Sequence, residues 1–105
     1  MLEDIFEHAA EAAPNECCGL IVQDGDKKRY IRMKNISENE NRFEMDGLAF
    51  ATYQLISKIL YVVHSHYDED CRPSQNDINN CNQLGIPYLI VSYPDKNHYI
   101  LEPND

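Results

Sequence analysis

The chain is 105 residues long, which allows one domain with one hydrophobic core. Hydrophobic residues make up 43% and charged residues 26%, as in ordinary soluble globular proteins. The formal net charge of −9 argues against nucleic-acid and membrane partners, because anionic surfaces are bound through clusters of Lys and Arg. We therefore expect a single domain over residues 1–105.

No apolar run approaches the roughly 20 residues of a membrane span, and the N-terminus lacks the basic and apolar segments of a secretory signal. These features favour an intracellular chain. The four cysteines, which are Cys17, Cys18, Cys71 and Cys81, contain no C-x-x-C pair. We expect them to be reduced thiols that serve as small core residues.

Hydrophobic spacing and chain-breaking residues predict eight elements. In chain order they are a helix over 2–13, a strand over 17–23, a strand over 28–34, a helix over 46–57, a strand over 59–66, a short helix over 74–84, a strand over 88–92 and a strand over 98–101. Pro14 ends the first helix, and Asp46 is suited to cap the second. The order α-β-β-α-β-α-β-β predicts a single α/β (α+β) sandwich with one mixed sheet flanked by helices.

The most informative motif lies at the end of the third predicted strand, where His64-Ser65-His66 follows an apolar run. Side chains two positions apart share one face of a strand, so the two imidazoles point the same way and Ser65 points away. Ser74 and Asp77 follow at a spacing that places them on one face of a helix. His64, His66 and Asp77 form a possible zinc ligand set that leaves the fourth position to water. Ser74 could then donate to a developing oxyanion.

Each part of this motif also has a purely structural interpretation. Ser74 can cap a helix whose first turn contains Asp77, and a lone H-x-H pair is common by chance. The two parts together, in order and after a buried strand, favour a metal site. A general base is also needed, and Glu16 at the start of the first strand is the leading candidate. On counts alone, a surface role for Glu16 is the commoner outcome in a chain with 18 acidic residues.

Three segments together resemble the JAMM (MPN+) zinc metallopeptidase family. They are Pro14-Asn15-Glu16-Cys17-Cys18-Gly19-Leu20-Ile21, His64-Ser65-His66 and Arg72-Pro73-Ser74-Gln75-Asn76-Asp77. The resemblance implies an MPN/JAB domain with a cytidine-deaminase-like sandwich, in which zinc-activated water hydrolyses a peptide or isopeptide amide. His64, His66 and Asp77 would hold Zn²⁺, Glu16 would be the general acid/base, and Ser74 would support the oxyanion.

Within this family, the segment from His8 to Leu20 looks most like the N-terminal domain of phage tail assembly proteins of the lambda K type. Those proteins usually carry a second, NlpC-type cysteine peptidase domain, and the sequence does not decide whether one follows here. The resemblance implies peptidoglycan peptides or phage tail proteins as substrates or partners. It also implies the bacterial host cytoplasm, or association with the virion, as the location.

Three alternatives remain open at this point. The acids Asp68, Glu69 and Asp70 follow His66 where the family often has proline, and they form either a solvated loop or a cleft lining for a cationic substrate group. The domain could instead be a non-catalytic assembly module whose zinc is structural or vestigial, closed by Cys71 or Asp70. A metallo-β-lactamase-like site is disfavoured, because Glu69 replaces the required histidine and the chain is short.

Overall fold

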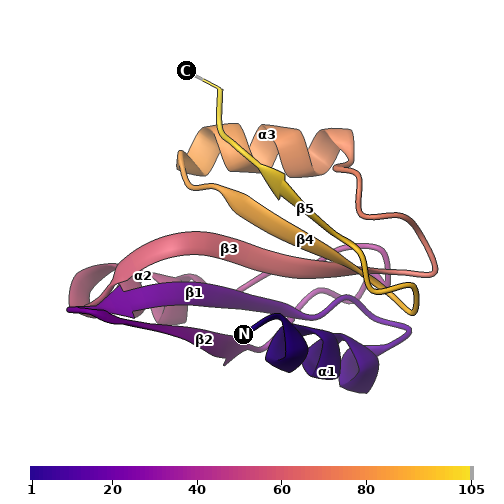
Figure 1. Ribbon diagram of the computed structural model, residues 1–105. Coiled ribbons are helices and arrows are strands. Elements are labelled where there is room, and N and C mark those ends of the chain that lie inside the picture. The colour runs from indigo at the N-terminus through magenta and orange to yellow at the C-terminus, as the bar shows by residue number, and fades with distance from the viewer. Residues whose placement is uncertain (105) are drawn as a thin grey trace.

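The computed structural model describes residues 1–104, which form one five-stranded sheet with three helices (Figure 1). In chain order the elements are α1 (Leu2–Ala12), β1 (Cys18–Asp24), β2 (Lys27–Met33), α2 (Gly47–Ile56), β3 (Lys58–Tyr67), α3 (Gln75–Leu84), β4 (Tyr88–Tyr93) and β5 (His98–Leu101). All eight elements match the sequence-based expectation in type and order. The mixed sheet with flanking helices confirms the predicted fold class.

The strand order is β2-β1-β3-β4-β5, so β3 lies at the centre of the sheet. Strands β3 and β4 are parallel and are joined through α3, whereas the other neighbouring pairs are antiparallel. His64 on β3 is opposite Cys18 of β1 on one side and Ile90 of β4 on the other. The first strand therefore starts beside the point where β3 ends.

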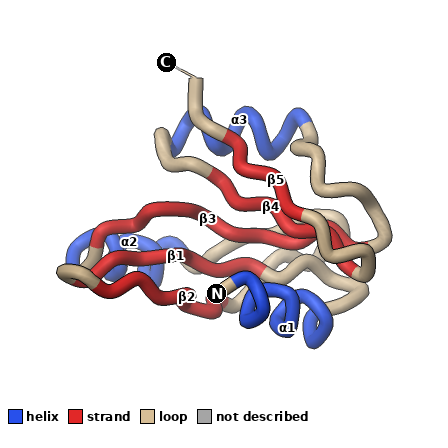
Figure 2. Tube along the Cα trace, in the orientation of Figure 1, coloured by secondary structure: helices blue, strands red, loops and turns tan. Residues whose placement is uncertain are grey.

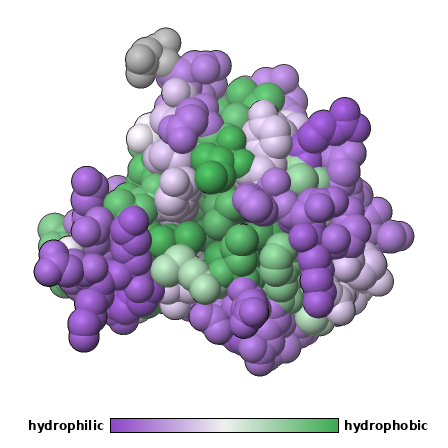
Figure 3. Space-filling model, in the orientation of Figure 1, coloured by the Kyte–Doolittle hydropathy of each residue, from purple (hydrophilic) through white to green (hydrophobic). Residues whose placement is uncertain are grey.

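Two hydrophobic clusters occupy the two faces of the sheet. The helices that contribute to them are the blue segments of Figure 2. On one face, Ile5 and Ala9 of α1 pack with Val63 and Val91 of the sheet. On the other face, the cluster around Leu20 and Val62 is covered by residues of α2 and α3. Helix α1 covers only part of its face, and apolar residues gather across the middle of the surface seen in Figure 3.

Gly19 on β1 makes room for an aromatic ring. A Cβ atom at this position would lie 2.4 Å from Cε1 of Tyr30 and 2.6 Å from the carbonyl oxygen of Ile31. The hydroxyl of Tyr30 is in turn 2.7 Å from Nδ1 of His8, which ties α1 to the hairpin. Within residues 1–104, none of the helices combines the length and the apolar character that a membrane span requires.

Candidate metal centre

His64, His66 and Asp77, called the metal centre below as a candidate site, lie together where β3 ends and α3 begins. Nε2 of His64 is 3.0 Å from Oδ1 of Asp77, and Nε2 of His66 is 3.2 Å from Oδ2 of the same carboxylate. All three side chains are buried, and one donor atom from each lies within 4.8 Å of the others. Among residues 1–104, this is the group whose geometry could hold a metal ion.

The imidazole of His64 gives the clearest indication that an ion fits this site. The side chain is fully buried. Its Nε2 lies 3.0 Å from Oδ1 of Asp77 without hydrogen-bond geometry, and its Nδ1 has no hydrogen-bond partner among residues 1–104. An unpaired buried nitrogen is costly unless another partner satisfies it. Two imidazole nitrogens and one carboxylate oxygen are a donor set that zinc accepts, so the residues fit the metal that the sequence motif implies.

His66 is oriented by the loop that follows it. Its Nδ1 lies 2.8 Å from the carbonyl oxygen of Asp70, which can only accept, so Nδ1 carries the hydrogen and Nε2 is directed at Asp77. Burial alone would lower the pKa of His66, but Asp77 and the Asp70 carbonyl outweigh it and raise that pKa to about 9. These contacts favour the protonated form of His66 beside the Asp77 carboxylate.

Asp77 is held by the start of α3 as well as by the imidazoles. The Ser74 N–H donates to Oδ2 of Asp77 at 3.0 Å, and the Asp77 N–H donates to Oγ of Ser74 at 3.1 Å, forming a capping box. Burial alone would raise the pKa of Asp77, but His64 and His66 hold it below its usual range. The structural interpretation of Ser74 and Asp77 is thus correct, and Asp77 at the same time faces both imidazoles.

Glu16 lines the same cavity as His66 and Asp77, two residues before the start of β1. The N–H of the next residue, Cys17, donates to Oγ of Ser65 at 2.8 Å, and the Ser65 N–H donates to the Cys17 carbonyl at 3.1 Å. This exchange extends the pairing of β1 with β3 beyond Cys18 and fixes the segment that carries Glu16. Burial raises the pKa of Glu16 to about 7, so this carboxyl can hold or release a proton near neutral pH.

The side chain of Asn35 also holds the segment that carries Glu16, and its amide group both donates and accepts two hydrogen bonds. Its Nδ2 donates to the carbonyl oxygens of Glu16, at 2.8 Å, and of Arg42, at 3.1 Å. Its Oδ1 accepts from the N–H groups of Ser37 and Glu44, both at 3.0 Å. A single side chain therefore joins the backbone of Glu16 to the loop over residues 35–45.

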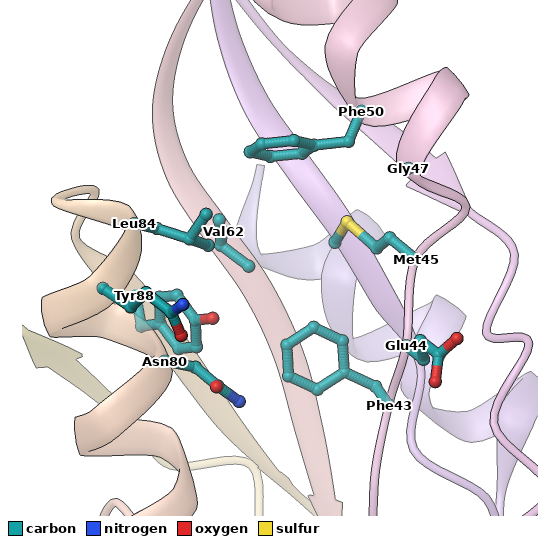
Figure 4. A pocket seen from close by; sticks show the side chains of 10 residues that line it. Phe43, Glu44, Met45, Gly47, Phe50, Val62, Asn80, Leu84 and Tyr88 are labelled. Atoms are coloured by element: carbon teal, nitrogen blue, oxygen red, sulfur yellow. The ribbon is translucent and has the colours of Figure 1, made fainter.

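That loop brings Phe43 onto the metal centre. The ring of Phe43 stacks on the imidazole of His64, with centroids 4.5 Å apart and planes 23° apart. Phe43 also lines a neighbouring apolar cavity of about 380 Å³, where it faces Tyr88 and lies beside Met45 and Phe50 (Figure 4). One aromatic ring thus separates the metal centre from an apolar space between the loop and α3.

The cavity at the metal centre has a volume of about 350 Å³ and is lined mainly by polar side chains. Glu69 and Asp70 of the acidic loop line it, whereas Asp68 does not. The Asp70 carboxylate forms an ion pair with Arg72 at 2.8 Å, and neither Asp70 nor Cys71 belongs to the group that could hold an ion. Within residues 1–104, no side chain closes the site in the way that a structural zinc site would require.

The structure brings all five motif residues to one place: His64, His66 and Asp77 in the buried group, and Glu16 and Ser74 at the cavity beside it. Asn35, Phe43 and the structural role of Ser65 are features of the site that the sequence motifs do not predict. Asn35 opens a polar loop of ordinary composition, so only its contacts distinguish it. Ser65 was recognised as pointing away from the imidazoles, and the missing information was its partner, Cys17.

Comparison with known proteins shows the family of the chain. The model of a family described as prokaryotic homologues of the JAB domain matches residues 1–102. The tail tip assembly protein K of Escherichia phage N15 is 31% identical over 103 residues, which are 97% of this chain. The chain spans only 42% of the length of that relative.

Solved structures show the same fold. A protein from Desulfitobacterium hafniense is 28% identical with a TM-score of 0.73, and the match covers 96% of this chain and 80% of that one. A JAB1/MPN domain protein from Archaeoglobus fulgidus is 24% identical with a TM-score of 0.63, and the match covers 99% and 94% of the two chains. The chain therefore belongs to the family of prokaryotic homologues of the JAB domain, and it is a homologue of a phage tail assembly protein.

Proposed function

We propose that residues 1–105 form one zinc-dependent hydrolase domain that cleaves a peptide or isopeptide amide. The observation that carries this proposal is the group of three buried donors, His64, His66 and Asp77. Two of them, His66 and Asp77, line a polar cavity that also contains Glu16. Zinc held by His64, His66 and Asp77 would supply an activated water and polarise the amide carbonyl. A purely structural zinc site would need a fourth protein ligand, and no described residue provides one.

Glu16 and Ser74 are given the remaining roles. The Glu16 carboxylate takes a proton from the attacking water and returns it to the leaving amine nitrogen, for which its pKa of about 7 is suited. Oγ of Ser74 accepts a hydrogen bond from the Asp77 N–H, so its own hydrogen is free to donate. We assign that donor to the amide oxygen as it gains negative charge.

The biological setting is proposed from the phage relative, whose name describes tail tip assembly. We propose peptidoglycan peptides or phage tail proteins as substrates, and the host cytoplasm or the virion as the location. A second candidate is a non-catalytic assembly module in a phage tail, which the name of the same relative favours.

The two candidates are separated by metal content and by one substitution. We expect the purified protein to bind one zinc ion, and His66→Ala to lose it. Glu16→Gln should keep the zinc and lower turnover about 10²–10⁴-fold, since it removes only the proton carrier. Turnover would be followed by mass spectrometry on cross-linked muropeptides and linear peptides.

Glu38→Gln is the matched control, because Glu38 is exposed and does not line the metal-centre cavity. Absence of zinc from the wild-type protein would overturn the hydrolase proposal. Zinc without cleavage of any peptide in the pool would favour the assembly module. Equal cleavage by wild type and Glu16→Gln would show that the activity arises elsewhere.

A further inference from the structure

Arg42 differs from the other arginines of the chain in having no partner. Arg29, Arg32 and Arg72 each form an ion pair at 2.8 Å, with Asp24, Glu11 and Asp70 respectively. Within residues 1–104, the guanidinium of Arg42 makes neither an ion pair nor a hydrogen bond, although the protein carries 18 acidic residues. Arg42 also lines the metal-centre cavity, together with the paired Arg72.

Hydrogen bonds fix the position of the Arg42 backbone relative to the rest of the site. Its carbonyl accepts from Nδ2 of Asn35, the same nitrogen that donates to the Glu16 carbonyl, and its N–H donates to the Asn39 carbonyl at 3.2 Å. The next residue, Phe43, stacks on His64. Arg42 therefore lies in a segment that Asn35 joins to the backbone of Glu16 and that Phe43 joins to His64.

The other charges around the cavity make a free guanidinium significant. Glu16, Glu69, Asp70 and Asp77 all line the cavity, and its second arginine, Arg72, is engaged with Asp70. These four carboxylates would repel an anionic ligand unless a cationic side chain also contacted that ligand. A guanidinium presents two parallel N–H groups that match a carboxylate.

We propose that Arg42 binds a carboxylate of the substrate, and that the scissile amide lies close to a free carboxylate. This inference rests on the proposed function, because it identifies the substrate class of the same site. Such a carboxylate is either the end of a peptide chain or the side chain of an acidic residue. Arg42 is thus a specificity-determining residue that acts on substrate binding.

The test uses zinc-loaded protein and three thiol probes that differ in charge: mercaptoacetyl-glycine, mercaptoacetyl-glycinamide and mercaptoacetyl-glutamic acid α-amide. The thiolate is a zinc ligand, so each probe anchors at the metal and presents its other end to the cavity. Affinity is measured by isothermal titration, and zinc content is measured on every sample. We expect one of the two carboxylate probes to bind about tenfold more tightly than the glycinamide, and which one it is identifies the source of the carboxylate.

In Arg42→Gln the preference should be reversed, so that the neutral probe binds more tightly than the carboxylate probes. The reason is that the carboxylates lining the cavity then repel the anion. Affinity for the neutral glycinamide should be unchanged. Arg42→Lys should keep part of the preference, since it retains the charge without the planar pair of donors. Arg29→Gln is the matched control, because Arg29 is an exposed arginine that does not line the cavity and pairs with Asp24.

Equal binding of charged and neutral probes to the wild type would overturn the proposal, as would a preference that survives Arg42→Gln. Failure of the metal site itself would be seen separately, as absence of zinc and of binding by all three probes. A zinc-loaded protein that binds the probes but cleaves nothing would still decide the role of Arg42.

Discussion

Removal of the Ser65 hydroxyl should destabilise the fold while leaving the metal ligands in place. In Ser65→Ala the N–H of Cys17 loses its acceptor, and both residues are only 1% exposed, so water cannot readily replace it. A buried donor left unsatisfied costs about 1–3 kcal/mol. With an unfolding entropy of about 2.1 cal/mol/K per residue, a chain of 105 residues loses about 5 °C in Tm for each kcal/mol. We therefore expect Tm to fall by about 5–14 °C.

The assay is thermal unfolding in the presence of a chelator, so that bound metal does not mask the change. Zinc stoichiometry should stay at the wild-type value, because the hydroxyl of Ser65 bonds to Cys17 and not to the ligand group. Ser65→Thr keeps an acceptor and should recover most of the loss. Thr52→Ala removes an exposed hydroxyl that bonds within α2 and should shift Tm little. A Tm for Ser65→Ala within 2 °C of wild type, with about 0.5 kcal/mol as the corresponding limit, would refute the reasoning.

Three further outcomes are expected. Gly19→Ala should lower the free energy of unfolding, measured in urea, by more than about 1 kcal/mol, because the new Cβ meets the Tyr30 ring and the Ile31 carbonyl. An unchanged midpoint of urea unfolding would mean that the Tyr30 ring moves at no cost. Zinc binding at pH 7.5 should release protons, because the raised pKa of His66, about 9, favours a protonated ring in the metal-free protein and the ion must displace that proton. Zinc affinity should therefore fall as the pH is lowered. Titrations in buffers of different ionisation enthalpy would detect the proton release. Zinc at 100 times its dissociation constant should stabilise the fold by about 2.7 kcal/mol over the chelated protein, and equal Tm values with and without zinc would contradict binding at the buried group.

The elements of this fold could be predicted from the sequence because each has a strong local signal. Pro14 ends the first helix, the apolar run before His64 marks the central strand, and Ser74 with Asp77 forms the cap that starts α3. The grouping of His64, His66 and Asp77 could be predicted for the same reason: their spacing within one strand and one helix already fixes which face they share.

The surroundings of the site could not be predicted, because they depend on contacts between residues far apart in the chain. Asn35 is 19 positions from Glu16, and Ser65 is 48 from Cys17. Phe43 lies in a loop with no periodicity, and its position over His64 follows from the hydrogen bonds that Asn35 makes to that loop. Hydrogen bonds of this kind carry no pattern in a single sequence.

The capping box has a consequence for how long an ion would remain bound. Oδ2 of Asp77 accepts from the Ser74 N–H while Oδ1 faces His64, so the carboxylate can leave the imidazoles only when the first turn of α3 opens. Helix ends open locally far more often than whole domains unfold. The residence time of the metal is then governed by fraying of one helical turn, and a substitution at Ser74 would shorten it even where the equilibrium geometry of the centre is unchanged.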